Sequence, residues 1–308
     1  MQNKSIISKT LSFLSDHDYR FLCLAKYGIF ANMPDEEYLS KAFHARMGYD
    51  LNLDNPQTFN EKLQWLKLHD HNPEYTRLVD KYEVKQYITN IIGEEYIIPT
   101  LGVWNSFDEI DFDKLPDQFV LKCTHDSGGL VICKDKKTLD IRAAREKINR
   151  CLKRKFFYLN REWPYNNVLP RIIAEPYLTE KDYQGLTDYK IHCFHGEPKL
   201  ILVCQDRFSE EGLAEDFFDT EWNHLDMQRP GQRHCSKSVS CPRSLDKILE
   251  ISKIISQDRK FLRVDFYVIN GQLKIGELTL YPASGFKPFD PPEWDMKLGR
   301  WIQINGNK

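Results

Sequence analysis

Hydrophobic and polar residues alternate along residues 262–269 and again along residues 273–280. A period of two predicts β-strands, because successive side chains of a strand point to opposite faces of the sheet. The Asn270-Gly271 pair between the two stretches is the strongest short-range signal of a β-hairpin. Residues 188–205 show a similar pattern and predict a second hairpin. We therefore expect antiparallel β-structure in the C-terminal part of the chain.

The turn at Asn270-Gly271 also predicts which charged side chains meet. In a near-symmetric register, Asp265 and Glu277 lie opposite one another on one face of the hairpin, and Arg263 shares that face because it lies two residues before Asp265. Two hard oxygen ligands at this distance suit Mg²⁺, which usually takes one or two protein carboxylates together with water and phosphate oxygens. The alternative is an exposed hairpin with ordinary surface charges.

The first part of the chain carries apolar residues at helical spacing, which predicts a mainly helical region over residues 1–116. Helices are expected over residues 12–30, 35–47, 59–68 and 76–92. Gly93 follows the last of these, where a glycine C-cap is common. Within that helix, Lys81 and Lys85 are four residues apart and share one face. Their charges serve either a ligand or an ordinary solvated helix surface.

A glycine loop between two apolar stretches marks the middle of the chain, within residues 118–133. Gly128 and Gly129 lack a Cβ, so the backbone N–H groups of this loop can approach phosphate oxygens closely. Lys122, at the end of the first stretch, would add a point charge. The loop fits neither a P-loop nor a dinucleotide fingerprint. A plain hairpin turn is the alternative reading.

Composition narrows the function classes. The 308 residues are 41% hydrophobic and 29% charged with a net charge of -2, which indicates a globular protein and gives no sign of a nucleic-acid partner. The eight cysteines form no CxxC pair, and the group His234, Cys235 and Cys241 is interpreted as coincidence. Neither a membrane span nor a signal peptide is indicated, so we expect a cytoplasmic protein.

Several short motifs occur in an order that resembles the ATP-grasp ligases. More narrowly, the chain resembles the TupA-like ATP-grasp group, which occurs with genes for bacterial surface polysaccharides. The resemblance covers residues 34–303 and rests on Phe119-Val-Leu-Lys122 with its glycine loop, Arg161-Glu162-Trp163-Pro164-Tyr165, Asp188-Tyr-Lys190, Arg263-Val-Asp265, Glu277-Leu-Thr279 and Tyr281-Pro282-Ala-Ser284.

This resemblance implies an α+β ATP-grasp fold that holds ATP and Mg²⁺ between two sub-domains. The implied division is a helical region over 1–116, a small sub-domain over 117–180 and a C-terminal sub-domain over 181–308. The implied nucleotide contacts are Lys81, Lys85, Lys122, His125, Asp126, Ser127, Gly128, Gly129, Glu175, Tyr177, Leu178, Asp182 (or Glu180 for the ribose) and Lys190. The implied metal ligands are Asp265, Glu277 and Thr279.

The sequence departs from the wider family pattern at two of these positions. Many ATP-grasp ligases have asparagine where this chain has Thr279, so a second Mg²⁺ is left open. Pro176, in the expected adenine-binding hinge, removes a backbone donor.

The implied reaction is a ligation in which a carboxylate attacks the γ-phosphate and an amine then attacks the acyl phosphate. The catalytic residues would be Arg263, Lys190 and Lys122. Cations and aromatic residues suited to a carboxylated sugar suggest Arg161, Arg207, Tyr281, Ser284 and Lys287 as acceptor contacts. A uronic acid of a surface polysaccharide and an amino acid or small amine are the expected substrates. A sugar kinase with the same site and an inactive nucleotide-binding scaffold are the alternatives, and the oligomeric state is left open.

Overall fold

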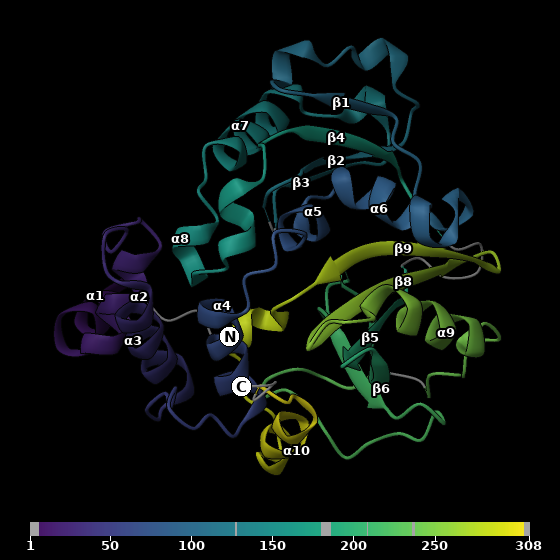
Figure 1. The fold of residues 1–308 in the computed structure, drawn as a ribbon. Coiled ribbons are helices and arrows are strands. Elements are labelled where there is room, and N and C mark those ends of the chain that lie inside the picture. The colour runs from purple at the N-terminus through teal and green to yellow at the C-terminus, as the bar shows by residue number, and fades with distance from the viewer. Residues whose placement is uncertain (1–5, 127, 180–185, 208, 236–237, 305–308) are drawn as a thin grey trace.

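A four-stranded antiparallel sheet forms the upper part of the molecule in Figure 1. The computed structural model describes residues 6–126, 128–179, 186–207, 209–235 and 238–304. The strand order is β1-β4-β2-β3, made of β1 (Gly102–Trp104), β2 (Phe119–Cys123), β3 (Leu130–Cys133) and β4 (Ile172–Pro176). Helix α7 (Ile141–Leu152) buries Ala144 and Ile148 against Phe119 and Leu121 of β2. The predicted strand, glycine loop and strand are confirmed.

A five-stranded antiparallel sheet forms the second layer, in the order β7-β6-β5-β8-β9. Its strands are β5 (Asp188–Phe194), β6 (Glu197–Gln205), β7 (Ala214–Phe218), β8 (Phe261–Ile269) and β9 (Gln272–Thr279). Helix α9 (Leu245–Ser256) buries Ile248, Ile251 and Ile255 in the core of this sheet. The two sheets lie one above the other in Figure 1, with β9 nearest to the small sheet.

The hairpin of β8 and β9 has the predicted turn and register. Asn270 and Gly271 have φ values of 49° and 81°, which is the positive φ pair that a tight two-residue hairpin turn requires. Asp265 pairs directly with Glu277. A register shift between Asp265 and Phe266 accounts for the extra residue on β9. The hairpin therefore presents both carboxylates at the same level of the sheet.

The predicted helix over residues 76–92 is wrong as a single element. The chain forms α5 (Tyr75–Val79) and α6 (Glu83–Ile92), and the Asp80 carboxylate accepts a hydrogen bond from the Tyr82 N–H at 2.8 Å in the turn between them. Lys81 lies in this turn, and its N–H donates to the Thr124 carbonyl at 3.2 Å. An aspartate side chain that accepts a hydrogen bond from a nearby backbone N–H offers that N–H an alternative to the helical hydrogen bond, and the helix is interrupted there. Lys81 and Lys85 therefore do not share a helical face.

Other helix predictions differ mainly at their ends. The helices at the N-terminal end are α1 (Ile6–Ser15), α2 (His17–Ala25), α3 (Asp35–Met47) and α4 (Phe59–His69). The expected helix over 12–30 is thus broken at Asp16, whose carboxylate caps α2 by accepting from the Tyr19 N–H. Short helical segments are α8 (Phe157–Asn160) and the 3-10 turns Glu94–Tyr96, Phe107–Glu109, Phe112–Lys114, Lys136–Thr138, Trp163–Asn167 and Pro282–Gly285.

The last helix, α10 (Glu293–Trp301), packs against the start of α4. A Cβ added at Gly299 would lie 2.1 Å from the Gln57 carbonyl oxygen, so only glycine allows this approach. Lys62 of α4 donates to the Gly299 and Ile302 carbonyls at 2.8 Å each. The Asn60 side chain donates to Asp295 at 2.8 Å. These contacts join residues separated by more than 230 positions.

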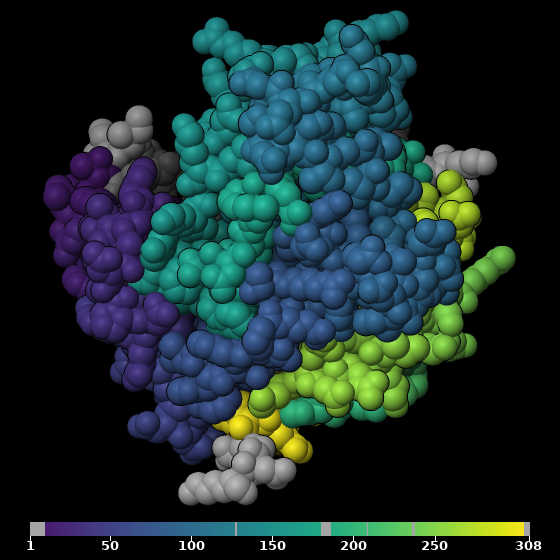
Figure 2. Space-filling model, turned by 45° about the horizontal axis from the view of Figure 1, so that its top comes forward, coloured from purple at the N-terminus to yellow at the C-terminus, as the bar shows by residue number. Residues whose placement is uncertain are grey.

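The hydrophobic cores cross the sub-domain boundary expected at residue 116. Strand β1 pairs with β4, and Phe107, Ile110 and Leu115 pack in the core of the small sheet. Helices α4, α5 and α6 instead pack in the core of the large sheet. In Figure 2 the blue and teal part of the chain forms the upper surface, the green part lies beneath it, and the purple N-terminal helices lie to one side. None of the described helices has the length and apolar character needed to cross a membrane.

Candidate active site

A cleft of about 1160 Å³ lies between the two sheets. Side chains and backbone from β2, β3, β4, β5, β8 and β9 line it, including Lys81, Lys122, Asp126, Gly128, Gly129, Glu175, Tyr177, Leu178, Asp188, Lys190, Arg207, Tyr267 and Glu277. Most residues predicted to bind a nucleotide therefore meet in one cavity, although they come from distant parts of the sequence.

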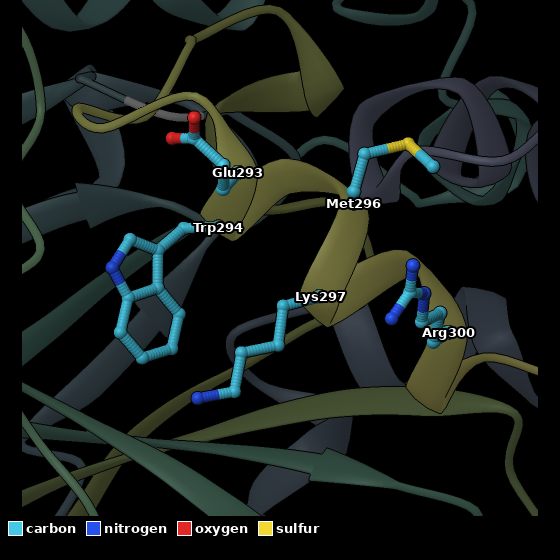
Figure 3. Close-up of a pocket in the computed structure, with 5 residues that line it drawn as sticks. All are labelled: Glu293, Trp294, Met296, Lys297 and Arg300. Carbon is cyan, nitrogen blue, oxygen red and sulfur yellow. The ribbon is translucent and has the colours of Figure 1, made fainter.

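A smaller hollow of about 410 Å³ lies on the outer face of α10. Figure 3 shows its five residues, among which Lys297 and Trp294 lie on the same side of the helix. The Lys297 ammonium lies 4.0 Å from the centre of the Trp294 ring, which is an ordinary surface cation–π contact. This hollow contains none of the residues predicted to act on a ligand.

On the small-sheet side of the cleft, two lysines contact one buried carboxylate. The Nζ atoms of Lys85 and Lys122 lie 2.5 Å from Glu175 Oε1 and Oε2 respectively. We call Glu175, Lys85 and Lys122 the Glu175 cluster. Burial alone would raise the pKa of Glu175, but the two ammonium groups outweigh it and lower that pKa below its ordinary value. The Glu175 carboxylate thus holds the two lysines. Its predicted contact with adenine stays a prediction.

Lys81 and the glycine loop lie beside this cluster. The Lys81 ammonium donates to the Asp126 carbonyl at 2.6 Å, and burial lowers the pKa of Lys81. Gly128 and Gly129 line the cleft with their backbone. Ser127 lies outside the described residues. Lys81 is half-buried, and its bond to the Asp126 carbonyl connects the glycine loop to the turn before α6.

Two other predicted loop residues turn out to have local roles. The Asp126 carboxylate is buried and accepts from Arg154 at 3.2 Å. His125 is also buried, and this burial lowers the pKa of its imidazole. The His125 side chain is not among the groups that line the cleft. Arg154 thus anchors the Asp126 carboxylate, and the nucleotide contacts predicted for His125 and Asp126 stay predictions.

The residues predicted to bind adenine and ribose are only partly described. Tyr177 and Leu178 follow β4 and line the cleft. Asp182 and the alternative Glu180 lie outside the described residues. The adenine and ribose contacts stay predictions.

On the large-sheet side, two cations contact Asp265. The Arg263 Nε and Nη2 atoms donate to Asp265 Oδ1 and Oδ2 at 2.6 and 2.8 Å, and Lys190 donates to Oδ2. The Arg263 Nη2 atom also lies 3.2 Å from Glu277 Oε1. We call Asp265, Glu277, Arg263 and Lys190 the Asp265 cluster. Arg263 shares the face of β8 with Asp265, as the sequence predicts.

Neighbouring charges keep Asp265 and Lys190 ionised. Burial alone would raise the pKa of Asp265, but Arg263 and Lys190 outweigh it and hold that pKa far below its ordinary value. In the same way, burial lowers the pKa of Lys190, and Asp265 more than reverses this shift. Asp265 is 3% exposed, whereas the side chain of Glu277 is 47% exposed. The cluster therefore offers one anchored carboxylate and one accessible carboxylate.

Thr279, the third predicted metal ligand, accepts from Arg263 Nη2 at 3.0 Å. It lies two residues after Glu277 on β9 and pairs with Arg263 in the register. The predicted metal ligands Asp265, Glu277 and Thr279 are therefore held together by one guanidinium. Their role as metal ligands stays a prediction.

The predicted acceptor residues fall into two groups. Arg207 lines the cleft and donates to Asp188 at 2.7 Å. Arg161 does not line the cleft: its guanidinium is buried and donates to the Phe30 carbonyl at 2.7 Å. Ser284 and Tyr281 are buried as well, and Ser284 donates to Glu162. Lys287, also away from the cleft, lies 4.0 Å from Glu215. Arg161 and Ser284 therefore make contacts within the fold, and their roles as acceptor contacts stay predictions.

Asp188 has no assigned role in the sequence prediction, yet it belongs to the cleft. Its Oδ2 atom lies 3.4 Å from Lys190 Nζ and 2.7 Å from Arg207 Nη2. The signal was available, because Asp188 and Lys190 are two residues apart on a strand and must share a face. Its link to Arg207, across the β5–β6 hairpin, could not be predicted from spacing.

Comparisons with known proteins point to one family. A sequence model described as TupA-like ATPgrasp matches residues 61–303. A search of curated protein sequences found no significant match.

Several solved structures are similar to this chain at low identity. D-alanine-D-alanine ligase from Helicobacter pylori is 15% identical, with 80% of this chain and 69% of that chain covered and a TM-score of 0.42. The Bacillus anthracis D-alanine-D-alanine ligase complexed with ATP is 17% identical, covering 73% of this chain and 65% of that one, with a TM-score of 0.43.

N5-carboxyaminoimidazole synthetase from Staphylococcus aureus is 14% identical, with 66% of this chain and 44% of that chain covered and a TM-score of 0.39. The present chain thus spans less than half of this synthetase and about two thirds of each D-alanine-D-alanine ligase. The family model matches well over half of the chain. The predicted α+β fold and family are therefore confirmed: the chain belongs to the TupA-like ATP-grasp family, and its enzyme class is that of the ATP-grasp ligases.

Proposed function

We propose that this protein is an ATP-dependent carboxylate–amine ligase that works through an acyl phosphate. The observation that carries the proposal is the pair of charged clusters on opposite sides of one cleft, within a chain of ATP-grasp sequence. One cluster supplies lysines for phosphate oxygens, and the other supplies carboxylates for a metal ion. Phosphoryl transfer needs both, because its catalysis consists mainly of positioning and charge stabilisation.

The phosphates of ATP would lie against Lys81, Lys85, Lys122 and the backbone of the glycine loop. Lysine ammonium groups act as point charges toward phosphate, and a glycine backbone allows close approach. Glu175 would position Lys85 and Lys122, as its present contacts suggest. Adenine would lie beside Tyr177 and Leu178, with Asp182 on the ribose.

The donor set on β8 and β9 fits Mg²⁺. Asp265 and Glu277 provide hard oxygen atoms, and the exposed Glu277 is open to the cleft. The hydroxyl of Thr279 would be a further oxygen ligand. When bound, the ion would neutralise charge on the phosphate oxygens. No cysteine or histidine belongs to this cluster, in keeping with a hard cation.

Lys190, Lys122 and Arg263 are the proposed catalytic residues. A substrate carboxylate attacks the γ-phosphorus, the bond to the bridging oxygen of ADP breaks, and an acyl phosphate forms. An amine then attacks the acyl carbon, loses a proton and expels inorganic phosphate, which leaves an amide. Lys190 and Arg263 would balance the charge of the phosphoryl group and the acyl phosphate.

The proposed acid is a uronic acid of a capsular or other surface polysaccharide, or its precursor, and the amine is an amino acid or another small amine. The resemblance to the TupA-like group supports this choice. Arg207, which lines the cleft, would pair with the acid of the sugar. Lys287 and Tyr281 lie outside the lining of the cleft and are not part of the proposal.

Hydroxylamine trapping tests this function directly. The chain is incubated with Mg-ATP, hydroxylamine and a panel of uronic acids that are free, nucleotide-linked or glycosidic. We expect ADP and a hydroxamate with one acid, detected by mass spectrometry. Glu277→Gln should abolish both products, whereas the matched control Glu221→Gln, at an exposed site outside the cleft lining, should retain them. A phosphorylated sugar without hydroxamate, or no ADP with any acid, would contradict the proposal.

A further inference from the structure

A third polar cluster lies on β7, the outermost strand of the large sheet. The buried Asp216 carboxylate faces two histidines from the segment that follows this strand. His224 Nε2 lies 3.0 Å and His234 Nδ1 lies 2.6 Å from the same atom, Asp216 Oδ1. The three ligand atoms lie within 4.8 Å of one another. Among the described residues, no other group of three or more histidine, cysteine or acidic side chains comes this close.

The segment between the histidines is tied to β7 by backbone contacts. His224 bridges to Phe218, and Arg233 bridges to Ala214, so the chain returns to the strand twice. Asp216 lies midway between these two points. The convergence of the three side chains is thus fixed by the fold on both sides.

The surroundings of Asp216 orient it toward the histidines. Its other oxygen, Oδ2, accepts from the Cys235 N–H at 3.0 Å. The His224 ring packs edge-on against Phe218 at 5.3 Å. Outer contacts of this kind hold metal ligands in place in known sites. The histidine side chains are 50% and 61% exposed, so an ion can reach them from solvent.

The chemistry of these donors selects the ion. Two imidazole nitrogens and one carboxylate oxygen are common ligands of Zn²⁺, which binds nitrogen at about 2.0–2.1 Å and oxygen at about 2.0–2.2 Å with four ligands. Mg²⁺ prefers oxygen ligands only. In the structure both histidines contact Asp216 directly, with their ring centres 6.0 Å apart, and small movements of these two exposed rings would open the space for an ion.

We propose that Asp216, His224 and His234 form a Zn²⁺ site that fastens the segment over residues 219–235 to the edge strand β7, with water as the fourth ligand. The site sits beside the cleft wall, because Arg233, next to His234, donates to Asp206 at 2.7 Å and Asp206 lines the cleft. The zinc ion would hold this wall in place. The inference does not depend on the proposed ligase activity.

Zinc binding to the full, tag-free chain tests the site. The protein is stripped with a chelator and titrated with ZnCl₂ against a chromophoric zinc chelator, with excess Mg²⁺ present to occupy the carboxylates of the cleft. Metal content after gel filtration gives the stoichiometry. His224→Ala and His234→Ala remove the ligands. His17→Ala, at a histidine that is 76% exposed and far from β7 in sequence, and Cys241→Ser, at an exposed thiol, are the matched controls.

We expect one zinc per chain in the wild type and in both controls. Each ligand variant should bind zinc at least about tenfold more weakly, the lower end of the cost of losing even an outer contact of a metal ligand. Zinc should also raise the melting temperature of the wild type but not of His234→Ala, because an ion that binds only the folded state stabilises it. The proposal is overturned by a wild type that binds no zinc, or by ligand variants that bind it as tightly as the controls.

Discussion

Both walls of the cleft hold a buried carboxylate in contact with two cations, but the two walls differ in their balance of charge. In the Glu175 cluster, two lysines share one carboxylate, so positive charge is in excess. In the Asp265 cluster, two cations face two carboxylates, so the charges balance. The side chains of Lys85 and Lys122 are 14% and 24% exposed, whereas those of Lys190 and Asp265 are 8% and 4% exposed.

This difference shows how one cleft can receive both an anion and a cation. The wall with excess lysine suits phosphate oxygens, whereas the cations of the balanced wall keep the Asp265 carboxylate ionised. Cations lower the pKa of Glu175 and Asp265 against the opposite effect of burial. Because the Lys190–Asp265 pair is less exposed than the Lys122–Glu175 pair, it should contribute more to stability. Four changes test this contrast, from the largest expected effect to the smallest.

Asp265→Asn should be the most damaging single change. It leaves Lys190 and Arg263 without their buried partner, and loss of one member of a buried ion pair costs about 3–5 kcal/mol in the free energy of unfolding. Urea unfolding at neutral pH measures this loss. Asp54→Asn, at an exposed aspartate, is the control and should leave stability unchanged. A variant as stable as this control would refute the ranking of the two clusters.

Glu175→Gln should cost less, about 1–3 kcal/mol, because Lys85 and Lys122 regain water more readily when their partner is neutral. The same urea series compares it with Asp265→Asn. If Glu175→Gln loses as much free energy of unfolding as Asp265→Asn, or more, then the exposure of the side chains does not decide how much each cluster contributes to stability.

Acid should weaken the wild type more steeply than either carboxylate variant. The folded-state pKa of Asp265 and Glu175 lies below the unfolded value, so the unfolded chain binds more protons in acid. The stability from these groups is present above the unfolded pKa values of about 4 and is lost as the pH falls toward the folded pKa. Urea midpoints between neutral pH and pH ~3 should therefore fall faster for the wild type. Parallel pH profiles would contradict this account.

Lys122→Met tests whether the lysine-rich wall binds the nucleotide. It removes one of the two lysines on Glu175, and a hydrogen bond to a charged group is worth about 1.5–3 kcal/mol. The affinity for Mg-ATP, measured by calorimetry, should therefore fall roughly 10- to 100-fold. Lys114→Met, at a lysine side chain that is 83% exposed, should bind as the wild type does. An unchanged affinity of Lys122→Met for Mg-ATP would show that this wall does not bind the nucleotide.

The sequence predicted the β8–β9 hairpin and the pairing of Asp265 with Glu277 because these features are local. A period of two and an Asn-Gly turn fix the register, and the register fixes which side chains meet. The helices were predicted well where apolar spacing is regular, as in α3 and α4. The break at Asp80 was missed because it depends on one side-chain hydrogen bond and on the distant Thr124 carbonyl.

Contacts between distant segments are the part of the structure that spacing does not predict. The group His234, Cys235 and Cys241 is interpreted as coincidence from the sequence, and nothing in its spacing places His234 beside His224 and Asp216. Arg161 was predicted to meet a substrate because arginine beside aromatic residues suits a sugar acid. The structure buries it against the Phe30 carbonyl and Asp35 instead. Composition alone does not distinguish a buried arginine that supports the fold from one that faces a ligand.

The packing of α10 on α4 has a consequence for the order of events during synthesis. Lys62 bonds to the carbonyls of Gly299 and Ile302, and Gly299 fits closely against Gln57. These partners leave the ribosome only after more than two hundred further residues have been added. Helix α4 therefore cannot reach its final packing before residues 299–302 have been synthesised.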